Sequence, residues 1–269
     1  VDEYTGQITP NKILDCIKKN RLKKIKALIT MYHGGYPENV KKIYDLKKKY
    51  ICLSIKENEY YTTNSIYDNY KHPKFEFDTI ERFKDVISFL IKSGYNVIRM
   101  GRGLNPASFD LNGFFDYAAS DFASDINDVL LSKNCEFVLS NQTGFDFLPG
   151  YWFSKPIYMY QIRSYRFLME TFPFRMFNPI IATLNNSLLN YYDVINFETK
   201  FWNNNDQNKL HELLLENGIK YSHYAPELIL ESAMHFLSDY ECNNFNLINS
   251  KFDNKITNFW NTFSEFINP

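Results

Sequence analysis

The sequence contains few cysteines and no long apolar run. Its four cysteines lie far apart and form no C-x-x-C pair, which argues against a disulfide framework and a structural zinc site. Cys52 and Cys135 fall within apolar runs, where small buried hydrophobes are expected rather than nucleophiles or ligands. No run of about 18 apolar residues predicts a membrane-spanning helix, and residues 1–6 lack the order of a signal peptide. The sequence therefore predicts a soluble, intracellular protein.

The chain also lacks an excess of charge and several well-known motifs. Its 30 Lys and Arg residues balance 31 Asp and Glu residues, so nothing in its net charge predicts a nucleic-acid partner. The five histidines show neither H-x-x-x-H nor H-E-x-x-H spacing, which argues against a zinc hydrolase. The absence of G-x-G-x-x-G, Walker and G-x-S-x-G motifs argues against a dinucleotide-binding dehydrogenase, a P-loop enzyme and an α/β-hydrolase.

Short apolar runs are the main structural signal that the sequence does contain. Hydrophobic residues make up 45% of the 269 residues, enough for one large core or two modest ones. Near-continuous apolar runs of this length are typical of parallel strands that are covered on both faces. The expected strands are residues 50–55, 95–100, 136–140 and 156–160.

Two helices are expected between these strands. One begins at Asp78 as N-cap, with Glu81 completing a capping box, and ends at Ser93. The other covers residues 124–131 and is capped by Ser124 or the residue after it. Strands that alternate with helices predict an α/β fold with a Rossmann-like, mostly parallel sheet flanked by helices.

The outer parts of the chain predict helices and loops. The basic helix expected at residues 11–29 has either a solvated face or a face that binds an anionic lipid or polymer. Prolines 173 and 179 interrupt the apolar residues 167–181, so no regular element is expected there. Further helices are expected at 208–215, 226–237 and 256–266, and a strand at 219–221. We therefore divide the chain into an N-terminal helical and loop segment (1–49), a Rossmann-like domain (50–240) and a C-terminal helix (241–269).

Ligands of open α/β sheets bind at the carboxyl ends of the strands, near helix N-termini. Residues 140–144 (Ser-Asn-Gln-Thr-Gly) follow the third strand and are small or carry hydroxyl and amide groups. A phosphate could accept hydrogen bonds from Ser140 and Thr143, and Gly144 would let it approach the backbone. The alternative is an ordinary turn with Thr143 as N-cap. The other loops at this edge are residues 56–58, 99–102 and 161–163.

Arg99 lies at the end of the second strand, where a buried guanidinium without a partner would be costly. We expect it to face an anion such as a diphosphate, or a carboxylate. Asp116, Asp125 and Asp128 are the candidate carboxylates. Asp125 and Asp128 share a helical face, but this spacing does not predict a metal site.

The order of these motifs resembles that of bacterial surface-polysaccharide glycosyltransferases of the O-antigen or capsule type, which have a GT-B-like donor domain. Residues 94–101 (GYNVIRMG) are the most specific part of the resemblance, which extends diffusely over residues 50–240. Residues 54–60 depart from the family's H-x-R-D-x-x-Y pattern, and Ala123 replaces a basic residue. The diffuse matches are Tyr50–Leu53, Asp116–Ala118, Ser124, Asp125, Asp128, Asn134–Phe137, Ser140, Gly144, Asp146, Lys155–Ile157 and Ala225–Ile229.

The resemblance implies a donor-binding domain like the C-terminal half of a GT-B enzyme, with a helical C-terminal extension. It implies sugar transfer from a nucleotide-diphosphate sugar to a carbohydrate or lipid-linked acceptor, without a metal or cofactor. The location would be cytoplasmic, at the inner face of the membrane if the chain associates with it peripherally. The implied donor-binding residues are Lys56, Glu57, Arg99, Gly101, Asp116, Ser124, Asp125, Ser140, Asn141, Gln142, Thr143 and Gly144.

Fewer than about fifty residues precede the first strand, less than a typical domain, so the acceptor-binding half is expected to be reduced or missing. Because the general base of such enzymes commonly belongs to that half, the sequence assigns none. Two alternatives to sugar transfer stay open. One is a GT-B-type nucleotide-sugar epimerase, and the other is a catalytically degenerate module for nucleotide-sugar binding or assembly.

Overall fold

The computed structural model describes residues 49–58, 77–141, 143–162, 175–179, 181–185, 187–189, 193, 213 and 215–242. The helices expected at 11–29 and 256–266 lie outside these residues, and so does most of the helix expected at 208–215.

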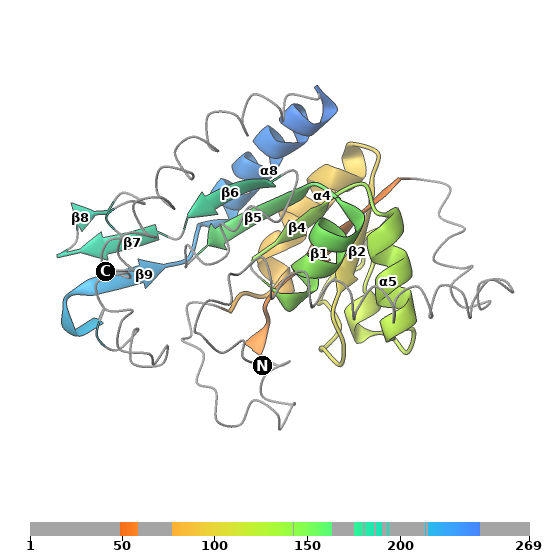
Figure 1. Ribbon diagram of the computed structural model, residues 1–269, viewed down its shortest axis with the longest axis horizontal. Coiled ribbons are helices and arrows are strands. Elements are labelled where there is room, and N and C mark those ends of the chain that lie inside the picture. The colour runs from red at the N-terminus through yellow and green to blue at the C-terminus, as the bar shows by residue number, and fades with distance from the viewer. Residues whose placement is uncertain are drawn as a thin grey trace, which may run out of the picture.

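A six-stranded sheet forms the centre of the molecule (Figure 1). Its order is β3-β2-β1-β4-β5-β6, and every neighbouring pair is parallel. The chain therefore builds outwards from β1 in one direction and then returns to add strands on the other side, which is the Rossmann order. The strands are β1 (Tyr50–Ser54), β2 (Asn96–Met100), β3 (Phe114–Phe115), β4 (Val138–Ser140), β5 (Ile157–Ile162) and β6 (Arg175–Pro179).

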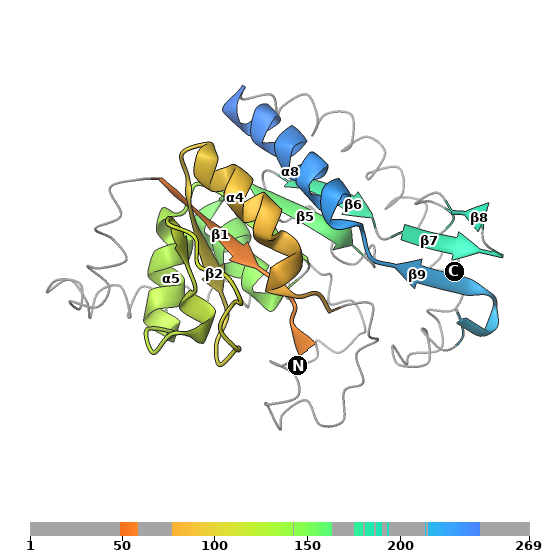
Figure 2. The ribbon, with the colours of Figure 1, turned by 180° about the vertical axis from the view of Figure 1, so that it is seen from behind.

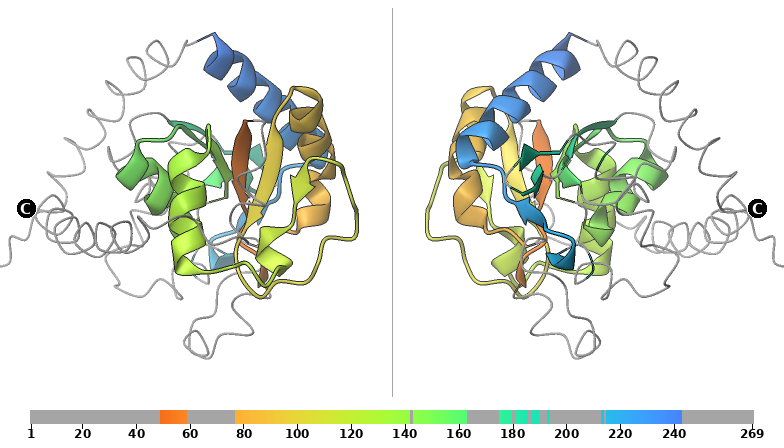
Figure 3. Two further views of the ribbon diagram at one scale, coloured as in Figure 1. Left: turned by 90° about the vertical axis from the view of Figure 1, so that its right-hand side faces the viewer. Right: turned by 90° about the vertical axis from the view of Figure 1, so that its left-hand side faces the viewer.

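Helices cover both faces of this sheet, which confirms the predicted α/β, Rossmann-like fold. The short helix η4 (Ile80–Phe83), α4 (Lys84–Lys92) and α8 (Pro226–Glu241) lie on one face, and α5 (Asp125–Asn134) lies on the other (Figures 2 and 3). Side chains of β1 alternate between the two resulting cores: Leu53 packs in the core under α4 and α8, and Cys52 in the core under α5. Cys52 and Cys135 are both fully buried, as predicted.

The start of α5 follows the sequence prediction, but the start of α4 does not. Ser124 caps α5, and its hydroxyl accepts from the backbone N–H of Asn127 at 3.4 Å. The predicted capping role of Asp78 is wrong, because η4 begins at Ile80 with Thr79 in the N-cap position. Asp78 turns inward instead, since its carboxylate pairs with Arg82 at 2.6 Å.

A second, antiparallel sheet lies beyond the carboxyl ends of β5 and β6 (Figure 1). It consists of β7 (Ile181–Leu184), β8 (Ser187–Leu188) and β9 (Ile219–Ser222), in the order β8-β7-β9. Only β9 was expected from the sequence. Three residues separate β9 from α8, so the chain passes from this sheet directly to a helix that packs on the six-stranded sheet.

The remaining short helices are η5 (Tyr117–Ala119), η6 (Gly144–Asp146) and the π-helix η7 (Phe147–Trp152), and the last two follow β4. Within the described ranges, no helix is long and apolar enough to cross a membrane.

Candidate functional site

The direction of strand order reverses between β1 and β4, the point where α/β sheets place their ligands. The two strands run side by side with Ser54 opposite Ser140. Both residues are the last of their strands, so the loops that follow leave the sheet together. One of these loops begins with Ile55 and Lys56, and the other contains residues 141–144.

Side-chain hydrogen bonds tie these two loops to each other. The hydroxyls of Ser54 and Thr143 lie 2.6 Å apart, and the backbone N–H of Lys56 donates to the Asn141 side-chain oxygen at 2.6 Å. Thr143 donates its hydroxyl proton to Asp146 at 3.2 Å, so Ser54 must be the donor in the pair with Thr143. Thr143 is therefore engaged with side chains from both loops, and does more than cap a turn.

Asp146 ends this chain of hydrogen bonds and is only 1% exposed. Burial raises the pKa of its carboxyl group to about 7, against the opposing effect of hydrogen bonds from Ser140 and Thr143. Its second oxygen, Oδ2, has no hydrogen-bond partner among the residues that the structure describes. Asp146 was part of the family resemblance, but no pattern in the sequence placed it in the site. A buried acid can be identified only when its surroundings are known.

The surface beside these loops is open at Gly144. A Cβ atom added there would meet nothing within 4 Å, and Gly144 is exposed. The glycine is therefore not required for packing within the described part of the chain. The neighbouring Gln142, also a predicted donor-binding residue, lies outside the described residues.

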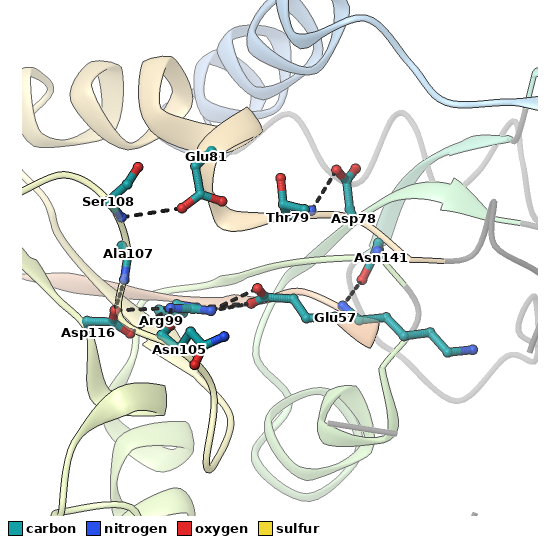
Figure 4. Close-up of polar contacts among 11 residues, drawn as sticks. Glu57, Asp78, Thr79, Glu81, Arg99, Asn105, Ala107, Ser108, Asp116 and Asn141 are labelled. Atoms are coloured by element: carbon teal, nitrogen blue, oxygen red, sulfur yellow. Dashed lines mark hydrogen bonds and ion pairs between the residues drawn. The ribbon is translucent and has the colours of Figure 1, made fainter. Parts of the chain in front are cut away.

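Arg99 lies on the other side of β1 and is enclosed by acceptors (Figure 4). Its Nε and Nη2 atoms donate to Glu57 at 2.8–3.0 Å. Its Nη1 atom donates to Asp116 at 3.0 and 3.1 Å and to the carbonyl of Asn105 at 3.0 Å. With Arg99 only 1% exposed, an anion would have to displace a carboxylate to reach it. Of the two interpretations of Arg99, the carboxylate partner is the one observed, with Asp116 as predicted and Glu57 in addition.

The other acidic candidates belong to the start of α5. Asp125 pairs with Arg102 at 2.5 Å, and Asp128 pairs with the same guanidinium. Tyr117 donates its hydroxyl proton to Asp128 at 2.7 Å. These carboxylates are thus partners of Arg102 rather than of Arg99.

Gly101, unlike Gly144, occupies a position where the local structure requires glycine. It adopts φ +142, and a Cβ atom there would meet side-chain atoms of Leu104 and Ala118 at 3.1 and 3.2 Å. Donor binding by Gly101, Ser124 and Asp125 stays a prediction. Across the described residues, no three His, Cys, Asp or Glu side chains gather as metal ligands would.

Known proteins offer only a distant likeness. No family model and no curated protein matches the sequence. One similar structure is an iron-containing dodecameric glycosyltransferase, TibC from enterotoxigenic E. coli, with 17% identity and a TM-score of 0.33. Another is the heptosyltransferase TibC in complex with ADP-D-β-D-heptose, with 19% identity and a TM-score of 0.33. Each match covers 49% of this chain and 32% of the other, so the chain spans about a third of their length. A likeness of this degree transfers no function.

Proposed function

We propose that this chain binds the diphosphate of a nucleotide-diphosphate sugar at the carboxyl ends of β1 and β4, and takes part in transferring the sugar. The observation that carries the proposal is the reversal of strand order at β1 and β4, where hydroxyl and amide side chains adjoin the open surface at Gly144. Hydroxyl groups and free backbone N–H groups are the donors that phosphates use in such sheets.

Lys56 supplies the positive charge in this proposal. It lies two residues after the end of β1 and is half-buried. Its ammonium group lies 5.9 Å from the centroid of the Phe77 ring. An ammonium on a flexible stem meets a phosphate as a point charge. The charge of Arg99 is balanced by Glu57 and Asp116.

Asp146 is compatible with an anion nearby because of its raised pKa. A carboxyl group with a pKa of about 7 holds its proton through the mildly acidic range and so adds little negative charge there. In the transfer reaction the leaving group is a diphosphate, and negative charge builds on it as the bond to the sugar breaks. Lys56 and the backbone N–H groups of the loop around Gly144 would stabilise that charge.

The finer assignments also belong to this proposal. We propose a carbohydrate or lipid-linked acceptor, as the surface-polysaccharide resemblance implies, and a reaction without a cofactor or an obligatory metal. The cytoplasmic face of the membrane is the proposed place of action. An acceptor-binding partner domain would complete the site.

A thermal-shift screen tests donor binding. UDP-, GDP-, ADP- and dTDP-sugars are each added to the 269-residue chain. A ligand at 100 times its dissociation constant should stabilise the fold by about 2.7 kcal/mol. Lys56→Ala should reduce this stabilisation. Lys49→Ala is the matched control, because Lys49 lies before the other end of β1 and its side chain is 68% exposed. No shift with any donor, or equal shifts for wild type and Lys56→Ala, would contradict the proposal.

A further inference from the structure

A second polar cluster adjoins the proposed diphosphate site. The backbone N–H of Asp78 donates to the carbonyl of Lys56 at 3.0 Å, so the cluster begins one hydrogen bond away from the proposed phosphate ligand. Its members come from distant parts of the chain: the segment before α4, the end of β5 and the segment between β9 and α8. They are Asp78, Arg82, Tyr160, Gln161 and His223.

The backbone of β5 is distorted where it meets this cluster. Gln161 adopts φ +60, which is uncommon for a residue other than glycine, and the pairing of β5 with β6 shifts register between Met159 and Ile162. Irregularities of this kind re-aim a side chain and are frequent beside active sites. Here the Gln161 amide nitrogen lies 2.8 Å from Nδ1 of His223.

Asp78 also lies near Nδ1 of His223. It is 4% exposed, and its Oδ1 pairs with Arg82 while also accepting from the N–H of Thr79 at 2.9 Å. Its Oδ2 lies 4.0 Å from Nδ1 of His223 and has no hydrogen-bond partner among the described residues. The His223 side chain is 33% exposed, so the ring reaches from this buried acid toward the surface.

This environment favours one tautomer of His223. The negative charge of Asp78 favours a proton on Nδ1, the nearer ring nitrogen. The structure places the Gln161 amide nitrogen against Nδ1. Amide oxygen and nitrogen are assigned from the hydrogen-bond network, and with the amide turned over its oxygen accepts the hydrogen bond from Nδ1–H. The other nitrogen, Nε2, then keeps its lone pair. A carboxylate that orients an imidazole in this way is the arrangement found behind histidine bases.

We propose that His223 is the general base of the sugar transfer, oriented by Asp78 and Gln161; this rests on the proposed function. The acceptor hydroxyl loses its proton to Nε2 while its oxygen forms a bond to C1 of the sugar. The bond between C1 and the diphosphate oxygen breaks, and its electron pair leaves with the diphosphate. His223 then returns the proton to solvent.

The charge balance suits this role. Burial lowers the pKa of His223, Asp78 opposes this and Arg82 adds to it, and the net shift is downwards. The ring is therefore neutral at neutral pH, which a base requires. Asp78 and Gln161 act through His223 and are positioning residues.

Turnover of His223→Gln tests the proposal. The probe is the nucleotide sugar that gives the largest thermal shift. Water takes the place of the acceptor hydroxyl, so that the sugar is hydrolysed, and the readout is the release of the nucleoside diphosphate. We expect release to fall about 100-fold or more, with the thermal shift unchanged. His235→Gln is the control, because His235 is 70% exposed on α8. Unchanged release in His223→Gln would overturn the role of His223 alone. If no nucleotide sugar shifted the wild type, the proposed function would fail, and this inference with it.

The pH profile of Asp78→Asn distinguishes positioning from a purely structural role. Release by the wild type should rise with pH as His223 loses its proton. Asp78 raises and Arg82 lowers the pKa of His223, so loss of the Asp78 charge should move this rise about one unit to lower pH. A rise at the wild-type pH would show that Asp78 does not set the state of His223, and would overturn its positioning role.

Discussion

The two sides of β1 end in different chemistry, although they share one edge of the sheet. On the β2 side, Arg99 lies between Glu57 and Asp116, and these charges satisfy one another in a nearly closed network. On the β4 side, Ser54 and Thr143 link neutral groups to a buried acid, and the surface at Gly144 is open. Charge on the first side holds the edge together, whereas on the second side the loop backbone at Gly144 is exposed.

The largest expected effect comes from breaking the charged side. Arg99→Met leaves two largely buried carboxylates without their partner, which should cost about 3–5 kcal/mol of unfolding free energy in urea titrations. Arg102→Met is the matched control, because its guanidinium is 41% exposed, and it should cost about 1 kcal/mol or less. Equal losses of unfolding free energy in the two variants would show that the burial of Arg99 does not make its ion pairs more stabilising than those of Arg102.

Asp146→Asn should change how stability depends on pH. The folded-state pKa of Asp146 is raised from 3.8 to about 7, so between these values the folded state holds a proton that the unfolded state releases. Stability of the wild type therefore falls as pH rises from about 4 to about 7 and then levels off. In the Asn variant, the fall in unfolding free energy between these pH values should be smaller by a few kcal/mol, on the order of 1.4 kcal/mol per pKa unit. Parallel pH curves for the two proteins would contradict the burial of an acid here.

Thr143→Val tests the neutral link between the two loops. The loss of its hydroxyl removes the bonds to Ser54 and Asp146 and should cost about 1–2 kcal/mol. Thr143→Ser keeps the hydroxyl and is the control. A Val variant as stable as the Ser variant would mean that the link contributes nothing.

Gly144→Ala should have the smallest effect on stability, within about 0.5 kcal/mol, since the added methyl group meets nothing in the described structure. Nucleotide-sugar affinity should nevertheless fall if a phosphate approaches the backbone there, as calorimetric titration would show. Unchanged affinity would show that the phosphate does not bind at the Gly144 backbone.

Local patterns in the sequence predicted the strands that build the site. β1, β2, β4 and β5 are short apolar runs covered on both faces. Near-continuous apolar runs of this kind can be recognised as buried parallel strands from the sequence alone. The sequence did not predict β6, because Pro179 interrupts the apolar run that contains this strand. Pro179 is instead the last residue of β6, an edge strand, where a missing N–H group costs little.

Contacts between distant residues could not be predicted in the same way. Asp116 was among the expected partners of Arg99, but Glu57 was not, since 42 residues separate it from Arg99. His223 carried no motif, and only β9 and the bulge in β5 bring it to Asp78 and Gln161. The sequence placed these loops at the carboxyl ends of the strands, but it did not show which of their side chains bind one another.

Hydrogen exchange of the backbone amides tests the central claim most directly. Exchange is measured with and without the nucleotide sugar that gives the largest thermal shift. The account predicts that protection increases at residues 141–146 and near Lys56, where the diphosphate would lie. Protection that increased elsewhere and left residues 141–146 unchanged would contradict a donor site at the carboxyl ends of β1 and β4.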